Sequence, residues 1–213
     1  MLNTIFSAFV KITAYPVQKV VFRTKVYYEN KRVQSRKIKG PVIIISNHTS
    51  VWDYGALLFV FFFRTLRCQM AEVLFKNKLL GLFLKLMGGI RVDRDTYDFG
   101  FVEKSCKILE KGGAVQIFPE SRLPLKGEER PLPFKPSAVY IALLSGAPIV
   151  PVFTNGAYFT KRRTRVMIGT PVCARDLYDE GLSEKENLSA ISDAVRDKII
   201  SLEKMLYERT KES

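Results

Sequence analysis

A histidine and an aspartate lie close together in the chain, directly after a run of apolar β-branched residues. His48 is the single histidine among the 213 residues, and Asp53 follows it five positions later. The charge of a histidine changes near neutral pH, and a neighbouring carboxylate can hold the ring so that it takes a proton from a hydroxyl group. This pair could therefore activate a hydroxyl as a nucleophile.

Asp53 also has a purely structural interpretation. Ser50 and Asp53 fit a capping box, in which the acidic side chain accepts a hydrogen bond from the amide of the residue that begins a helix. His48 at the end of a strand can likewise be an ordinary turn residue. From this spacing alone we favour the structural role for Asp53, so a catalytic role needs support from the rest of the chain.

Two more groups of polar residues follow predicted strands. Arg94 ends a short alternating pattern, and Glu120 and Arg122 come after an apolar run at 114–118. Because parallel strands bring their carboxyl ends to one edge of a sheet, where ligands bind, we expect these groups to lie near His48. Guanidinium groups bind phosphate through paired hydrogen bonds, so two arginines at this edge favour a phosphate-bearing ligand.

Strand and helix patterns alternate along the chain. The strands are predicted near 42–45, 66–70, 90–94, 114–118, 148–153 and 165–168. The helices are predicted near 51–63, 74–87, 97–111, 136–144 and from a capping box at Ser183 and Glu186 onward. This alternation predicts the α/β class, with a mostly parallel sheet flanked by helices.

Positive charge is concentrated at the start of the chain. The formal net charge is +13, and residues 1–40 hold nine Lys or Arg but one acid. A second basic cluster consists of Lys161, Arg162, Arg163 and Arg165. Such charge attracts anionic partners, which include phospholipid surfaces, nucleic acids and acidic carrier proteins. No nucleic-acid-binding module is visible in the sequence, so we expect no nucleic-acid partner.

The first residues predict an amphipathic segment. Five apolar residues share one helical face: Leu2, Ile5, Phe6, Phe9 and Ile12. Lys11, Pro16 and Lys19 interrupt the apolar run, which is too short to span a membrane. We expect one or two short helices in a membrane interface, although a helix packed on the core fits this pattern about as well. We therefore divide the chain into a basic membrane-association segment at 1–30 and a single domain at 31–213.

The cysteines indicate neither a metal site nor a disulfide framework. Cys68, Cys106 and Cys173 are widely spaced and odd in number. We expect reduced, mostly buried thiols in a protein that faces the cytosol, and no metal ion. A nucleophilic pair of a cysteine with His48 remains an alternative, although nothing around these cysteines supports one.

The polar groups and several apolar residues stand in four ordered signatures, which are similar to those of the glycerolipid acyltransferases, the PlsC-like family typified by 1-acyl-glycerol-3-phosphate acyltransferase. The signatures are Asn47-His48 with Asp53, the segment 89–94 ending in Asp93-Arg94, Phe118-Pro119-Glu120-Ser121-Arg122, and Phe134-Lys135 with Val150-Pro151-Val152. The third signature departs from the family pattern, because Ser121-Arg122 replaces Gly-Thr-Arg. This departure leaves the identity of the acceptor open.

The resemblance implies a role for each residue. His48 would take the proton of an acceptor hydroxyl, and Asp53 would fix the imidazole tautomer. Asp53 could also keep its capping role by using its second oxygen. The substrate-binding residues implied are Asn47, Arg94, Glu120, Ser121, Arg122 and Lys135, with the acceptor phosphate on the two arginines and the lysine. Glu120 would order this site or contact the glycerol. The acyl donor would be acyl-CoA or acyl carrier protein, and no further cofactor is implied.

The expected function is acyl transfer to the free hydroxyl of 1-acyl-glycerol 3-phosphate, which gives phosphatidic acid. The fold implied is that of the glycerolipid acyltransferases, and the location implied is the cytoplasmic face of a membrane, peripheral or monotopic. Alternative acceptors are glycerol 3-phosphate, another lysophospholipid or an aminolipid. A thioesterase and a non-enzymatic basic membrane-binding protein are further alternatives.

Overall fold

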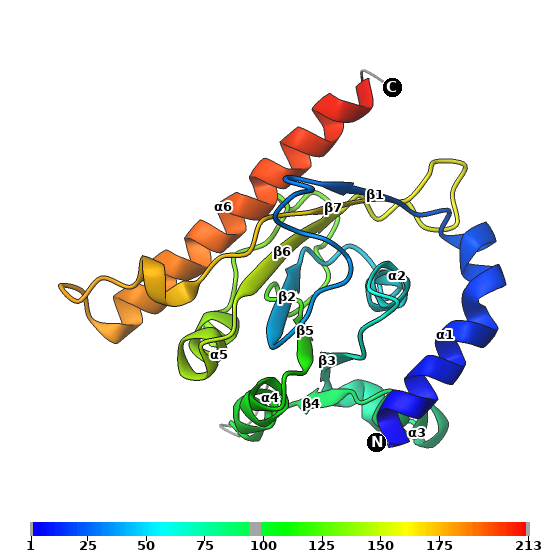
Figure 1. The fold of residues 1–213 in the computed structure, drawn as a ribbon, viewed down its shortest axis with the longest axis horizontal. Coiled ribbons are helices and arrows are strands. Elements are labelled where there is room, and N and C mark those ends of the chain that lie inside the picture. The colour runs from blue at the N-terminus through cyan, green and yellow to red at the C-terminus, as the bar shows by residue number, and fades with distance from the viewer. Residues whose placement is uncertain (1, 94–98, 212–213) are drawn as a thin grey trace.

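A seven-stranded sheet forms the centre of the chain in the computed structural model, which describes residues 2–93 and 99–211 (Figure 1). The strands are β1 (Lys25–Tyr28), β2 (Val42–Ser46), β3 (Leu66–Ala71), β4 (Ile90–Val92), β5 (Ala114–Ile117), β6 (Ile149–Thr154) and β7 (Arg165–Ile168). Their order across the sheet is β1-β7-β6-β2-β5-β3-β4, and every neighbouring pair is parallel except β6 and β7. The predicted α/β class with a mostly parallel sheet is confirmed.

Helices cover both faces of the sheet. They are α1 (Leu2–Val21), α2 (Asp53–Val60), α3 (Lys78–Leu86), α4 (Gly100–Glu110), α5 (Ser137–Ser145) and α6 (Glu184–Lys211), with short 3-10 turns at Glu72–Phe75 and Ala174–Leu177. Figure 1 shows α4, α5 and α6 on one side of the sheet and α1, α2 and α3 on the other. The sheet is therefore the middle of three layers.

Strand β2 lies in the middle of the sheet, between β5 and β6, and all of its residues are buried. Ile43 and Ile45 pack into the apolar core on the side of α4, α5 and α6. Val42 and Ile44 pack into the core on the side of α2. A strand buried on both faces needs a continuous apolar sequence, which explains the run of Val and Ile. The residues that follow β2 are thus held at the centre of the carboxyl edge.

Several helix ends differ from the sequence prediction for local reasons. The helix predicted at 74–87 is divided, because the side chain of Asn77 accepts a hydrogen bond from the Leu80 amide at 3.0 Å and begins α3 there. The capping box of α6 is confirmed. The Ser183 amide donates to Glu186 at 2.9 Å, and the Glu186 amide donates to the Ser183 hydroxyl at 3.3 Å.

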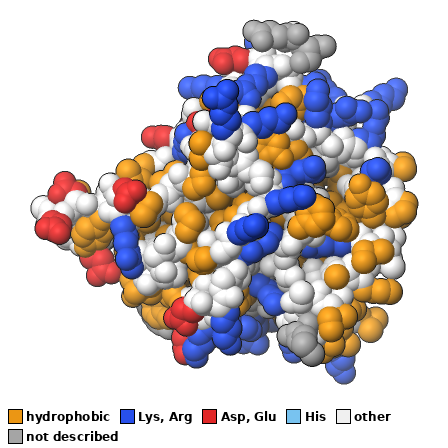
Figure 2. All heavy atoms as spheres, viewed as in Figure 1, with side chains coloured by type: hydrophobic (Ala, Val, Ile, Leu, Met, Phe, Trp, Pro, Cys, Tyr) orange, Lys and Arg blue, Asp and Glu red, His pale blue; other side chains and the backbone are white. Residues whose placement is uncertain are grey.

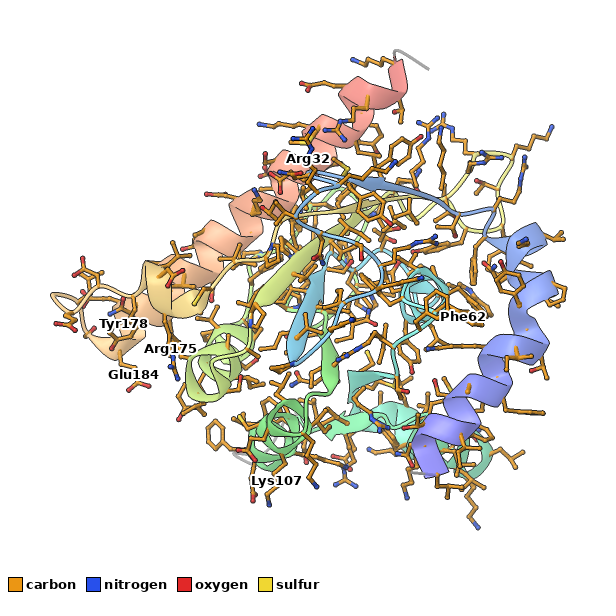
Figure 3. All side chains as sticks on the ribbon, in the orientation of Figure 1. Arg32, Phe62, Lys107, Arg175, Tyr178 and Glu184 are labelled. Carbon is orange, nitrogen blue, oxygen red and sulfur yellow. The ribbon has the colours of Figure 1, made fainter. Side chains whose placement is uncertain are left out.

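Helix α1 is one continuous helix of 20 residues and packs on the domain through one face. Lys11 is buried on this face, and its ammonium group donates to the carbonyls of Phe62, at 3.0 Å, and Arg64 just after α2. Burial lowers the pKa of Lys11 to about 8. Phe62 lies between α2 and α1, where its ring meets Tyr15 edge-on at 5.6 Å (Figure 3). The N-terminal helix is therefore docked on the core.

The opposite face of α1 is exposed and apolar. It presents the side chains of Leu2, Ile5, Phe9, Ile12 and Val20. Figure 2 shows hydrophobic side chains along the edge of the molecule that α1 forms. Phe6 is an exception to the predicted face, because it packs inward against Phe83 at 5.8 Å. Among the described residues, no helix combines the length and hydropathy that a membrane-spanning segment requires.

The sheet begins inside the segment that we assigned to residues 1–30. Strand β1 pairs in parallel with β7, with Lys25 opposite Arg165, and so forms an edge of the sheet. The amide of Lys25 also donates to the Thr164 carbonyl at 2.9 Å. Only α1 and the turn after it therefore lie outside the sheet at this end of the chain.

Candidate active site

His48 and Asp53 are in direct contact where β2 ends and α2 begins. Nδ1 of His48 lies 2.8 Å from Oδ2 of Asp53. The side chain of Asp53 is fully buried, whereas that of His48 is 20% exposed. The imidazole also stacks on the ring of Phe118, with centroids 4.3 Å apart and planes 20° apart. The carboxylate and the phenyl ring together fix the imidazole. Its Nε2 atom has no hydrogen-bond partner among the described residues, and the side chain lines a cavity.

Five donors surround the Asp53 carboxylate. Oδ2 accepts hydrogen bonds from His48 Nδ1 and from the amides of Thr49 at 2.6 Å and Ser50 at 2.8 Å. Oδ1 accepts from the hydroxyls of Thr49 at 2.8 Å and Tyr158 at 2.7 Å. Hydrogen bonds to an ionised group are about twice as strong as neutral ones, so this arrangement suits a carboxylate. A charged Asp53 next to Nδ1 places the imidazole proton on Nδ1 and makes Nε2 the acceptor.

The structure confirms one of the two hydrogen bonds that the capping interpretation of Asp53 predicts. The Ser50 amide donates to Asp53, as a capping box requires, but the Ser50 hydroxyl accepts from the Trp52 amide at 3.3 Å. Helix α2 thus has no complete box, and its N-cap residue makes no side-chain cap. We expected separate oxygens to serve the helix and the histidine. Instead Oδ2 serves both, because the three donors converge on one side of the buried carboxylate.

Tyr158 is a site residue that the sequence did not reveal. It is buried in the loop after β6, and its hydroxyl reaches both Asp53, at 2.7 Å, and the Thr154 hydroxyl, at 3.1 Å. Burial and the neighbouring Asp53 carboxylate raise the pKa of Tyr158, so its hydroxyl stays protonated and donates. No motif contains this tyrosine, since it stands 105 residues away from its partner in the sequence.

We predict that Tyr158→Phe lowers kcat while leaving KM nearly unchanged. The substitution removes one of the five donors but keeps the ring, so the carboxylate loses part of its orientation and the fold keeps its packing. One hydrogen bond to a charged group corresponds to a fall of up to about 10–100-fold in rate. Steady-state kinetics of the two proteins measures this effect. An unchanged kcat would show that the remaining donors hold Asp53 by themselves.

Glu120 connects the histidine to a distant loop. Oε1 accepts from the backbone amide of His48 at 2.6 Å, and Oε2 accepts from the amide of Leu132 at 2.8 Å. The side chain is buried, and this burial raises the pKa of Glu120, although the two amide hydrogen bonds oppose the shift. Both carboxylate oxygens are thus used within the protein. Glu120 holds the backbone of His48 in place.

Asn47 joins the ends of two neighbouring strands. Its amide nitrogen donates to the Thr154 carbonyl at 2.9 Å, and its oxygen accepts from the Thr154 amide at 2.8 Å. This paired bonding continues the β2–β6 ladder beyond the last strand residue. Asn47 is buried and is not among the residues that line the cavity at His48. Like Glu120, it positions the histidine.

The residues predicted to bind a phosphate do not all line the cavity at His48. Arg122 lines the cavity at His48, but its guanidinium is paired with Glu128 through two hydrogen bonds of 2.7 and 2.6 Å. This pairing lowers the pKa of Glu128 to about 2. Lys135 is exposed, and its amide donates to the Pro119 carbonyl at 2.9 Å. Arg94 lies outside the described residues.

Ser121 shows how the third signature tolerates its altered sequence. Its φ is 63°, a left-handed conformation that favours glycine. The resemblance noted from the sequence implies a glycine at this position. Ser121 also lines the cavity, and its amide donates to the Phe118 carbonyl at 3.1 Å. Ser121 therefore holds a backbone conformation that a glycine adopts without strain.

A cavity of about 450 Å³ opens at His48. It extends along apolar residues of β3 and α3, among them Met70, Leu80 and Leu84. Its polar end holds His48 with Ser121 and Arg122. A ligand that is polar at one end and apolar along its length would match this lining.

The cysteines do not provide a nucleophile at this cavity. Cys68 lines it, but burial raises the pKa of the thiol strongly, and the sulfur donates to the Gln69 carbonyl at 3.4 Å. A thiolate is therefore disfavoured there. Within 2–93 and 99–211, no cluster of His, Cys, Asp or Glu is arranged to hold a metal ion.

Comparisons with known proteins identify relatives of this chain. The family model described as Acyltransferase matches residues 23–155, which is more than half of the chain. The chain is 33% identical over 138 residues to the 1-acyl-sn-glycerol-3-phosphate acyltransferase of Bacillus subtilis (strain 168), covering 62% of this chain and 66% of that protein. It is 30% identical over 129 residues to the human 1-acyl-sn-glycerol-3-phosphate acyltransferase beta, covering 58% of this chain and 45% of that protein.

A solved structure shares the fold. The crystal structure of the 1-acyl-sn-glycerophosphate acyltransferase from Thermotoga maritima superposes with a TM-score of 0.65 at 20% sequence identity. The match covers 94% of this chain and 79% of that chain. The structural match thus spans almost all of the sheet and helices described above. The sequence matches span between 45% and 66% of the length of the curated relatives named here.

Proposed function

The chain belongs to the acyltransferase family, and from this membership we propose that it transfers a fatty acyl group to the free hydroxyl of 1-acyl-glycerol 3-phosphate, giving phosphatidic acid. One observation supports this more than any other. A histidine held by a buried carboxylate presents its free Nε2 edge at an apolar cavity that also contains an arginine. These parts fit an acyl chain, a reacting hydroxyl and a phosphate.

The chemistry follows from the position of the proton. The acceptor hydroxyl gives its proton to Nε2 of His48 while its oxygen attacks the carbonyl carbon of the acyl thioester. A C–O bond forms, the C–S bond breaks, and the imidazolium returns the proton to the departing thiolate. Asp53 stabilises the imidazolium between the two transfers. This route uses no covalent acyl-enzyme, metal ion or further cofactor.

We assign the acceptor phosphate to Arg122, together with Arg94 and Lys135. Arg122 stands at the polar end of the cavity and already binds a carboxylate in the two-bond geometry that suits a phosphate. The phosphate would take the place of Glu128 on this guanidinium. Solvent reaches both side chains of this ion pair, so a phosphate can compete with the Glu128 carboxylate for the guanidinium.

The remaining predicted residues receive different roles. We assign Ser121 to the wall of the acceptor site, because it lines the cavity next to Arg122. Asn47 and Glu120 act through the backbone around His48, because all of their side-chain hydrogen-bonding atoms bind backbone groups or neighbouring residues inside the protein. They are therefore positioning residues and do not contact the substrate.

Arg122→Gln should raise KM for the phosphate-bearing acceptor by roughly 10-fold or more and leave KM for the acyl thioester unchanged. The reason is that glutamine keeps the length of the side chain but loses the charged fork. Initial rates measured against each substrate separate the two constants. Arg91→Gln is the matched control, since Arg91 is exposed, pairs with Glu72 at 3.4 Å and is outside the cavity. Equal effects of the two variants would contradict the assignment.

A comparison of acceptors tests the proposal directly. The purified full chain is given one acyl thioester and, in turn, 1-acyl-glycerol 3-phosphate, glycerol 3-phosphate, a neutral lysophospholipid and an aminolipid. The highest kcat/KM is expected for 1-acyl-glycerol 3-phosphate. Activity on phosphate-free acceptors alone would overturn the role of Arg122. Release of free fatty acid without any acceptor would indicate a thioesterase instead.

The donor and the location complete the proposal. We propose acyl-CoA or acyl carrier protein as the co-substrate, and parallel assays with the two thioesters distinguish them. The apolar face of α1 and the basic charge of residues 1–40 support peripheral or monotopic binding to an anionic phospholipid surface. The cytoplasmic leaflet carries such lipids, so we place the enzyme there. No nucleic-acid partner is proposed.

A further inference from the structure

A second hollow, far from His48 along α2, is lined by positive charge. It has a volume of about 440 Å³ and lies where the end of α1, the start of β1, the end of α2 and the β6–β7 loop meet. We call it the basic pocket. Its cationic residues are Lys19, Arg23, Lys25, Arg36 and Arg163. None of its lining residues is acidic, and it shares no lining residue with the cavity at His48.

The five cations stand without an ion-pair partner among residues 2–93 and 99–211. Lys19 and Lys25 instead lie over the rings of Tyr15 and Tyr27, at 4.9 and 5.0 Å. Like charges gathered in one hollow repel one another and destabilise the folded state. An anion bound among them would relieve this repulsion.

An uncharged residue that lines the basic pocket also has an unsatisfied hydrogen-bonding group. The Oγ1 of Thr24 is buried without a hydrogen-bond partner among the described residues, and Thr24 lines the pocket. A buried hydroxyl without a partner is costly, and an anion oxygen would supply an acceptor. Arg23 has a φ of 47°, an unfavourable left-handed conformation for a non-glycine residue. This turn brings residues 23–25 together into the pocket.

The surroundings of the basic pocket point to a lipid. Tyr15 lines it, and the neighbouring side chains Ile12, Val17 and Val20 of α1 are exposed and apolar. In Figure 2, Lys and Arg side chains gather over the β6–β7 loop, next to hydrophobic side chains along α1. A phosphate attached to acyl chains could place the chains against α1, which a soluble phosphate cannot do. Interfacial helices bind membranes through this combination of apolar burial and charge.

We propose that the basic pocket binds the phosphate of an anionic phospholipid head group, at a site separate from the acyl-transfer site. Guanidinium groups of Arg36 and Arg163 would bind the phosphate oxygens from two different loops. Binding there would fix how α1 and the cavity at His48 are oriented toward the lipid surface. The inference does not depend on acyl transfer, because it concerns residues outside the reacting site.

Vesicle binding of the full chain tests the basic pocket. The vesicles consist of phosphatidylcholine alone or with a minority of phosphatidylglycerol, and bound protein is measured by co-sedimentation. The double variant Arg36→Gln/Arg163→Gln is expected to lose about 10-fold or more in affinity for the anionic vesicles. The control is Lys104→Gln/Lys111→Gln, which removes the same charge from exposed residues in and just after α4, on the opposite side of the sheet. It should lose less than about 3-fold.

Each other outcome overturns the proposal. Equal losses in the two double variants would mean that only net charge matters, and no loss in the first variant would mean that the pocket is not used. Calorimetric titration with inorganic phosphate tests whether a soluble anion binds the basic pocket. If inorganic phosphate binds saturably and also displaces the vesicles, the ligand of the basic pocket is a free anion and not a lipid head group. The rate of acyl transfer in neutral detergent micelles should be the same in both double variants and the native chain. This assay therefore tests the proposed acyl-transfer function independently of the proposed lipid binding.

Discussion

Replacing His48 by alanine is expected to lower the rate of acyl transfer by roughly 10²–10⁴-fold, because it removes the proposed general base. The loss should appear in kcat, since the ring contacts the reacting hydroxyl and the substrate-binding residues remain. No other histidine of the chain can replace it, because His48 is the only one. Initial rates with saturating acceptor and thioester measure the effect.

The fold of this variant must be checked in the same experiment. The His48 ring is one-fifth exposed and stacks on one side of Phe118, and the backbone amide of His48 that binds Glu120 is unchanged by the substitution. We therefore expect the circular dichroism spectrum to stay native and the thermal midpoint to change little. A folded His48→Ala protein with near-normal activity would end the proposed mechanism.

Asp53→Asn should also lower kcat by roughly 10²–10⁴-fold, and it isolates the effect of charge. The asparagine oxygen can take the position of Oδ2 and accept from His48 Nδ1 and the two amides. The asparagine NH₂ group then faces the hydroxyls of Thr49 and Tyr158, which can rotate and accept. The tautomer and the fold remain, but the imidazolium loses its negative partner.

A smaller change at the same carboxylate is the control. Thr49→Val removes the hydroxyl donor of 2.8 Å to Oδ1 and keeps the charge of Asp53, so it should cost much less activity than Asp53→Asn. Activity of Asp53→Asn within about 3-fold of the native chain would mean that Asp53 only organises the start of α2. That outcome would support the purely structural, helix-capping role that the spacing of Ser50 and Asp53 alone favours.

The sequence predicted the parts of this protein that depend on local pattern. The Val and Ile run of β2 is buried on both faces, so its position and the histidine after it could be predicted. The Ser183 and Glu186 box depends on neighbours in one helix turn, and it was also predicted correctly. The contact between His48 and Asp53 was implied by the family resemblance, because their spacing alone favoured the capping role of Asp53.

The partners that complete the site could not be predicted, because they are distant in the chain. Tyr158 meets Asp53 across 105 positions, and Asn47 pairs with Thr154 across 107. Glu120 was expected either to order the acceptor site or to contact the glycerol, and the sequence did not show that its oxygens bind the amides of His48 and Leu132. Hydrogen bonds of this kind depend on tertiary placement, which a periodic pattern does not contain. The role of Arg94 stays a prediction.

The two oxygens of Glu120 have a consequence for how new specificities arise. They fix the backbone at His48 and at Leu132 by accepting hydrogen bonds from both amides. Arg196 of α6 donates a hydrogen bond of 2.7 Å to the Pro131 carbonyl. Residues 121–131 are therefore an insert between fixed points. An exchange of this insert would replace Ser121 and Arg122 of the proposed acceptor site while the backbone of His48 stays in place.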